Sequence, residues 1–136
     1  MTQKTATRKD LLVSFDGTVG RIAFGIEGAY SSGIRKIYSK NPIYDNLGLK
    51  YLIFSSKDIQ GLIKSHATGT VILHASSSID YLTFSFPPEN KVKKFNKIIT
   101  PIFDKILSNK NQIRTLEKLR DTLLPKLMGG KVRVRE

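Results

Sequence analysis

Residues 89–127 read ENKVKKFNKIITPIFDKILSNKNQIRTLEKLRDTLLPKL, and this stretch decides how the chain is organised. Apolar residues recur in it with alternating spacings of four and three, the repeat of a helix that packs along a second helix. Eight of the ten positions in this repeat are apolar, and Asn109, one of the exceptions, is a residue type that can set register and oligomeric state. The predicted helix–helix interface consists of Phe95, Ile99, Ile102, Ile106, Asn109, Ile113, Leu116, Leu123 and Leu127.

The ends of this helix are also marked. A proline pair directly before Glu89 favours a helix start, and a glycine pair at positions 129 and 130 favours a stop. Pro101 lies inside and is expected to kink the helix or make it locally irregular. The helix would be about 58 Å long, more than a domain of about 85 residues needs to cover itself. We therefore expect a partner helix, with a helix folded back on its own domain as the alternative.

Composition changes at Pro87 and Pro88. Residues 1–88 carry ten Lys and Arg against six Asp and Glu and are rich in Gly, Ser, Thr, Tyr and Phe. Residues 89–136 carry thirteen against five and are rich in Lys, Ile, Leu and Asn. We predict a small domain over residues 1–88 and, over residues 89–136, a long helix that ends in a basic tail with Lys131, Arg133 and Arg135.

The first part favours a mixture of strands and helices. Asp16 and Gly17 follow an apolar run and are a hairpin-turn signal, and Glu27 with Gly28 is a second turn candidate. Ser56 is suited to cap a helix. The predicted fold class is α+β, a small mixed domain followed by one long helix of the coiled-coil type. The expected strands are residues 11–15, 19–24, 33–39, 71–73 and 82–86, and residues 45–54 and 55–63 are expected to form one or two helices.

Charge is the strongest feature of the composition. The chain of 136 residues carries 23 Lys and Arg against 11 Asp and Glu, a formal net charge of +12. Such an excess suits a polyanionic partner, with nucleic acid first and an anionic membrane second. The absence of Cys excludes disulfides and thiolate chemistry. No apolar run is long enough to span a membrane, and the polar N-terminus is unlike a secretory signal, so we expect a cytoplasmic protein.

Nothing in the sequence favours an enzyme. Residues 14–18, SFDGT, come close to the D-x-D-G-T signature of haloacid dehalogenase phosphatases, but Ser14 stands where the nucleophilic Asp is required. There is no phosphate-binding G-x-x-x-x-G-K-[ST] loop, and the carboxylates are scattered. His66 and His74 alone make a weak metal site, and we expect them to face solvent or DNA instead. We therefore predict no catalytic residue, no metal and no cofactor in this chain.

Two clusters of basic and small polar residues favour DNA binding instead. Arg and Lys contact phosphates or guanine, and Ser, Thr and His read base edges or brace the backbone. Each Lys or Arg taken singly favours a solvated surface charge, and only the residues taken together on a chain of this net charge raise DNA binding to an equal alternative. The predicted DNA-binding residues are Arg21, Ser31, Ser32, Arg35, Lys36 and Lys40 in the first cluster and Lys64, His66, Thr68, Gly69 and Thr70 in the second.

Three stretches resemble the specificity subunits of Type I restriction-modification systems. Residues 10–36, DLLVSFDGTVGRIAFGIEGAYSSGIRK, and residues 66–96, HATGTVILHASSSIDYLTFSFPPENKVKKFN, resemble the target recognition domain of that family. Residues 113–134, IRTLEKLRDTLLPKLMGGKVRV, resemble its conserved helical region. A full family member has two recognition domains and two helical regions, whereas this chain has one of each, and its recognition domain is short on the N-terminal side.

This resemblance implies a non-catalytic DNA reader within an enzyme complex. The α+β domain would read one half of a bipartite target in double-stranded DNA. The long helix would pack antiparallel on a second helix, from another copy of the chain or a second half-subunit. Methylation subunits would bind the helices and carry S-adenosylmethionine, and the restriction subunit would join them. The alternatives are an oligomerisation and docking module without independent DNA binding and, with less support, an RNA-binding protein.

Overall fold

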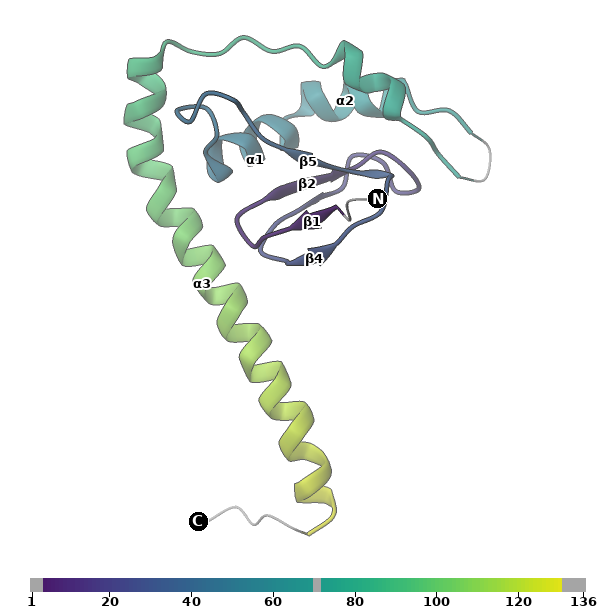
Figure 1. The fold of residues 1–136 in the computed structure, drawn as a ribbon, viewed down its shortest axis with the longest axis vertical. Helices are drawn as coiled ribbons and strands as arrows, with labels where there is room; N and C mark the ends of the chain where they lie inside the picture. The colour runs from purple at the N-terminus through teal and green to yellow at the C-terminus, as the bar shows by residue number, and fades with distance from the viewer. Residues whose placement is uncertain (1–3, 70–71, 131–136) are drawn as a thin grey trace. The chain divides into compact units, whose positions relative to one another are not determined.

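The computed structural model describes residues 4–69 and 72–130, and it confirms an α+β fold. Short strands come first, two helices and a 3₁₀-helix follow, and one long helix ends the described chain (Figure 1). Two compact units divide the chain, the first reaching Phe103 and the second starting at Asp104. The elements are β1 (Thr5–Ala6), β2 (Leu11–Ser14), β3 (Ile22–Ala23), β4 (Gly28–Ala29), β5 (Ile34–Ile37), α1 (Leu47–Ser55), α2 (Lys57–Ser65), η1 (Ser76–Tyr81) and α3 (Glu89–Met128).

The first unit is built around β2, which lies between β3 and β5 in an antiparallel sheet. Alternate side chains of β2 and the residue after it, Leu11, Val13 and Phe15, are fully buried and pack with Phe54 of α1 and with α2. On the other face, Leu12 is buried beside Ala6 of β1, which pairs with β4. The sheet is therefore covered by the two helices on one face and by the β1–β4 pair on the other (Figure 1).

Helices α1 and α2 meet at a single residue, Ser56. Its backbone N–H donates to the Ile53 carbonyl at 3.2 Å and so ends α1. Its side-chain oxygen accepts a hydrogen bond from the Ile59 backbone N–H at 3.4 Å and so begins α2. The predicted cap at Ser56 is confirmed, and of the one or two helices that were predicted the structure has two.

The predicted ends of α3 are also confirmed. The Pro88 carbonyl accepts hydrogen bonds from the first turn, including one from the Lys91 backbone N–H at 2.9 Å. After Met128, Gly130 has a φ of 69°, a left-handed conformation that glycine adopts without strain. The helix passes through Pro101 without interruption, so this proline does not break it.

The N-terminal part of α3 belongs to the core of the first unit. Val92 and Phe103 are buried at 2% and 6% exposure, and Phe95 and Ile99 between them are half-buried. A Cβ on Gly48 of α1 would lie 2.5 Å from Ile99 Cγ1, so the two helices touch closely here. The first unit therefore includes residues 89–103, which the predicted boundary at Pro88 assigned to the second part.

Two strand predictions are wrong. Residues 82–86 form no ladder; the ring of Phe86 instead packs on Tyr44, with ring centroids 4.5 Å apart, and Phe84 packs on Phe54. Residues 72 and 73 are not in a strand, and Val71 lies outside the described residues.

The hairpin predicted at Asp16 and Gly17 is confirmed, because β2 and β3 pair antiparallel, and its connection covers residues 15–21. The second turn prediction needs correction. Gly28, expected in a second turn, belongs to β4.

Candidate nucleic-acid interface

Three connections meet at the end of β2. The Phe15 backbone N–H donates to the Gly33 carbonyl at 2.8 Å, which ties in the segment before β5. The Phe15 carbonyl accepts from the Ala75 backbone N–H at 2.7 Å, and the Gly17 N–H donates to the Leu73 carbonyl at 2.8 Å. We call this set of connections, residues 15–21, 31–33 and 66–75, the loop cluster; residues 70 and 71 within it are outside the described chain.

The third connection of the loop cluster folds back on itself. Thr68 and His74 exchange two backbone hydrogen bonds, of 2.9 Å and 2.8 Å, in an isolated antiparallel bridge. Gly69 has a φ of 120°, and a Cβ there would collide with the Ile72 carbonyl oxygen. Only glycine fits this backbone conformation. The turn therefore explains why position 69 is a glycine, independently of the DNA contact predicted for it.

The structure brings several predicted DNA-binding residues to the loop cluster. Ser31, Ser32, Thr68 and Gly69 are exposed there, and the Arg35 guanidinium donates to the Ser32 carbonyl. Hydroxyl groups, backbone amides and a guanidinium on one surface are the donors and acceptors that base edges and phosphates require.

Of the other predicted residues of the first cluster, one lies in the loop cluster and two lie outside it. Arg21 is exposed in the loop cluster, where its backbone N–H donates to the Ser14 hydroxyl at 3.1 Å. Lys36 follows Arg35 in β5, so the two side chains point to opposite faces of the sheet. Lys40 follows the far end of β5, away from the end that meets Gly33.

Lys36 has partners within the chain. Its Nζ lies 3.6 Å from Asp10 Oδ2 and donates to the Thr5 carbonyl at 3.5 Å. Burial by itself raises the pKa of Asp10, but hydrogen bonds from Thr7 and the charge of Lys36 outweigh it and hold that pKa below the usual value of an aspartate. Lys36 is therefore part of a surface ion pair on the far face of the sheet, and the structure does not bring it to the loop cluster.

The second predicted cluster begins at the end of α2. Lys64 is exposed in the last turn. His66 ends the helix, with its Nδ1 2.9 Å from the Leu62 carbonyl oxygen and its ring stacked on Tyr81 at a centroid distance of 4.3 Å. His66 therefore anchors the start of the third connection against η1. Thr70 lies outside the described residues.

Sequence reasoning missed the contact between Asp16 and His74. The Asp16 carboxylate Oδ1 lies 2.9 Å from His74 Nδ1, and both side chains belong to the loop cluster. The residues are 58 positions apart, and no motif or periodicity connects them. Asp16 was predicted only as part of a turn, and His74 was predicted to face solvent or DNA rather than to bind a metal. The described residues contain no group of three or more His, Asp or Glu that could hold a metal ion.

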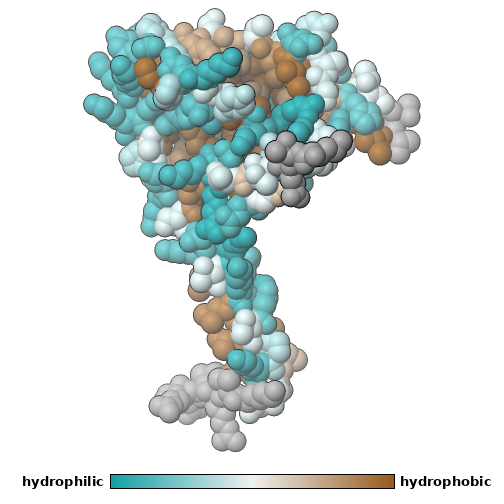
Figure 2. All heavy atoms as spheres, viewed as in Figure 1, coloured by the Kyte–Doolittle hydropathy of each residue, from teal (hydrophilic) through white to brown (hydrophobic). Residues whose placement is uncertain are grey.

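The helix–helix residues fall into two groups. Phe95 and Ile99 are half-buried in the first unit, and Ile106 is half-buried in the second. The remaining predicted positions are exposed, and Figure 2 shows hydrophobic side chains among hydrophilic ones in the C-terminal part of α3. No helix in the described chain is both long and apolar enough for a membrane span. The exposed predicted positions are Ile102, Asn109, Ile113, Leu116, Leu123 and Leu127.

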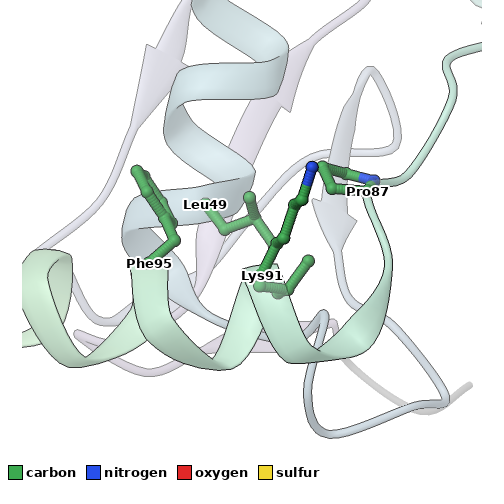
Figure 3. A pocket seen from close by; sticks show the side chains of 5 residues that line it. Leu49, Pro87, Lys91 and Phe95 are labelled. Atoms are coloured by element: carbon green, nitrogen blue, oxygen red, sulfur yellow. The ribbon is translucent and has the colours of Figure 1, made fainter.

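A pocket of about 310 Å³ lies where α3 begins. Leu49 of α1 lines it together with Pro87, Val92 and Phe95, and the Lys91 side chain extends along it (Figure 3). None of its lining residues is in the loop cluster, so the pocket is separate from the candidate interface.

Comparisons with known proteins connect both units to one family. The MjaVIII specificity subunit of a Type I restriction enzyme from Methanocaldococcus jannaschii is 34% identical over 121 residues, which is 87% of this chain and 28% of the relative. The HindI specificity subunit from Haemophilus influenzae is 29% identical over 96% of this chain and 28% of its own length. The MjaIX specificity subunit from M. jannaschii is 43% identical over 60 residues, 44% of this chain and 14% of the relative.

No protein-family model matches the chain, and no solved structure matches it. The chain spans less than a third of the length of these curated relatives. The similarity nevertheless covers almost the whole chain in two of them, from the sheet through α3. Over this part, the chain belongs to the family of Type I restriction enzyme specificity subunits.

Proposed function

We propose that this chain is the non-catalytic DNA-reading component of a Type I restriction-modification complex and reads one half of a bipartite duplex target. The observation that carries the proposal is the 34% identity to a specificity subunit over 87% of the chain. The loop cluster supplies the reading surface, and the net charge of +12 favours a polyanion. One recognition domain corresponds to one half of the target.

The exposed apolar side chains of α3 support the second part of the proposal. Leu116 is 62% exposed and Ile113 is 55% exposed, on a helix with the spacing of a helix–helix interface. A second helix, from another copy of this chain or from a second half-subunit, covers this stripe antiparallel to α3. The methylation subunit docks on the paired helices and carries S-adenosylmethionine, and the restriction subunit completes the complex.

Binding of the complete chain, with and without its cognate methylation subunit, to a randomised duplex library tests this function. We expect enrichment of a specific duplex. We also expect the affinity to fall steeply with salt: the logarithm of the binding constant should decrease with the logarithm of the salt concentration with a slope of about −0.9 per neutralised phosphate. Arg35→Ala, which removes a guanidinium that donates to Ser32 of the loop cluster, should weaken binding, whereas Lys40→Ala, which removes the same charge beyond the far end of β5, should have a much smaller effect.

Other results would contradict the proposal in distinct ways. Enrichment of no duplex, with the methylation subunit still bound, would leave a docking module whose working part is the exposed stripe of α3. Preference for single-stranded RNA over duplex DNA would point to an RNA-binding protein. Equal effects of the two substitutions would place the DNA outside the loop cluster.

A further inference from the structure

The Asp16 carboxylate lies between two connections that expose hydroxyl side chains. On one side, its Oδ1 is 2.9 Å from Nδ1 of His74, in the connection that carries Thr68. On the other side, Gly33 directly follows Ser32 and approaches so closely that an added Cβ would lie 2.6 Å from Asp16 Oδ2. One carboxylate thus contacts both of the connections that present Ser and Thr in the loop cluster.

The backbone supports this arrangement. Asp16 and His74 face each other in an isolated antiparallel bridge, flanked by the hydrogen bond from the Gly17 N–H to the Leu73 carbonyl. The same His74 exchanges backbone hydrogen bonds with Thr68. A shift of His74 relative to Asp16 therefore changes the position of Thr68 relative to Ser32.

The pair is too exposed to serve the core. The side chains of His74 and Asp16 are 60% and 39% exposed, and ion pairs on surfaces contribute little to the free energy of unfolding. Base-edge readout is sensitive to small displacements of the reading groups, so a contact that fixes two loops relative to each other affects recognition more than stability.

We propose that Asp16 and His74 are positioning residues for DNA recognition, holding the Ser31–Ser32 and Thr68–Gly69 segments in one arrangement. This inference rests on the proposed reading of DNA by the loop cluster. The pair itself need not touch a base. It lowers the entropy that two separate loops would lose when they bind, and it sets the spacing between their hydroxyl groups.

The decisive variants change His74. His74→Leu removes the ring N–H, whereas His74→Asn keeps a side-chain N–H near the position of Nδ1. The measured quantity is the ratio of affinities for the duplex that the wild-type chain enriches and for a random duplex, in the complex with the methylation subunit. We expect His74→Leu to lower this ratio about three- to fivefold with little change in binding to random duplex, and His74→Asn to restore most of it.

A double variant and a control variant distinguish a positioning role of the pair from a stabilising one. Asp16→Ala should lower the ratio at least as much as His74→Leu, because it also removes the contact with Gly33, and the double variant should be no worse than Asp16→Ala alone. Asp104→Ala, which removes an exposed carboxylate of α3, should leave the ratio unchanged. A fall in unfolding temperature that His74→Asn does not correct would assign the pair a structural role and overturn the inference.

A second measurement does not depend on DNA binding. Amide hydrogen exchange of the free, full chain reports on the hydrogen bonds of Gly17, Thr68 and His74. We expect exchange there to rise a few-fold in His74→Leu, to return in His74→Asn, and to stay unchanged in α1. If the wild-type chain enriches no duplex, the proposed function fails while exchange still tests the link between the loops. If it enriches one and His74→Leu changes neither measurement, the inference fails alone.

Discussion

Residues 92–103 and residues 113–127 belong to the same helix and repeat apolar side chains with the same spacing, but they have different surroundings. Phe103 is 6% exposed and lies against α1, with its ring 5.5 Å from those of Phe24 and Tyr51. Leu116 is 62% exposed. The helical repeat therefore does not identify the partner, which is the chain's own domain for the first stretch, and it does not identify every buried residue there, because Phe103 lies outside the predicted repeat and Ile102 within it is exposed.

The largest expected effect is the difference in the free energy of unfolding between a truncated side chain in the first stretch and one in the second. Phe103→Ala should lower the free energy of unfolding by about 3 kcal/mol, because it removes a buried ring and leaves a cavity. Leu116→Ala should change it by less than about 0.5 kcal/mol in dilute solution, where its side chain is exposed. Urea denaturation of the two variants at equal, low concentration measures the difference. Similar losses would mean that the second stretch is also packed within the chain.

The second expected effect is on association. Leu116→Asp combined with Leu123→Asp should weaken self-association or half-subunit binding more than tenfold, because each places a charge in an apolar interface. Thr122→Asp introduces one such charge on a different face of α3 and should change association little, whereas either Leu→Asp substitution alone should still weaken it. Sedimentation equilibrium measures both. A wild-type chain that stays monomeric and binds no half-subunit would contradict the interface that we propose for this stretch.

A smaller effect tests how closely α1 packs against residues 92–103 of α3. Gly48→Ala would bring a Cβ to 2.5 Å from Ile99 Cγ1 and 2.9 Å from Phe103 Cδ2, so we expect a net loss of about 1 kcal/mol despite the better helix propensity. Gly61→Ala on α2 meets no atom within 4 Å and should stabilise the chain by about 0.5–1 kcal/mol. Thermal unfolding distinguishes the opposite signs. A stabilised Gly48→Ala variant would show that α3 moves away from α1 at little cost.

Local signals in the sequence were sufficient for the elements that carry them. The proline and glycine pairs predicted both ends of α3, and Ser56 predicted the junction of α1 and α2. These features act on neighbouring residues, so a short stretch contains the information. The run from Leu11 predicted β2 for the same reason.

Contacts between distant residues were not predictable in this way. β1 and β4 have two residues each and pair across more than twenty positions, so neither shows a periodicity. Residues 82–86 alternate apolar and polar side chains as a strand does, but their rings pack on α1 and on Tyr44 and the backbone forms no ladder.

For the candidate site, the residue types in the two clusters were predicted, but their grouping was not. Arg35 and Lys36 were both predicted to contact DNA, although the alternation of β5 places their side chains on opposite faces; the approach of Asp16 to His74 depends on the whole unit.

The junction at Ser56 has a consequence for how such a domain can vary over evolution. Because Ser56 alone separates α1 from α2 and hydrogen-bonds to both, inserting or deleting one residue there would break this double cap and displace Ile59 and Ile63 from their places in the core. The connections of the loop cluster follow the ends of strands and of α2, and a change in their length leaves those core residues in place. Changes in chain length are therefore expected to accumulate in the loop cluster and to be absent at Ser56, so that new binding preferences arise without a new scaffold.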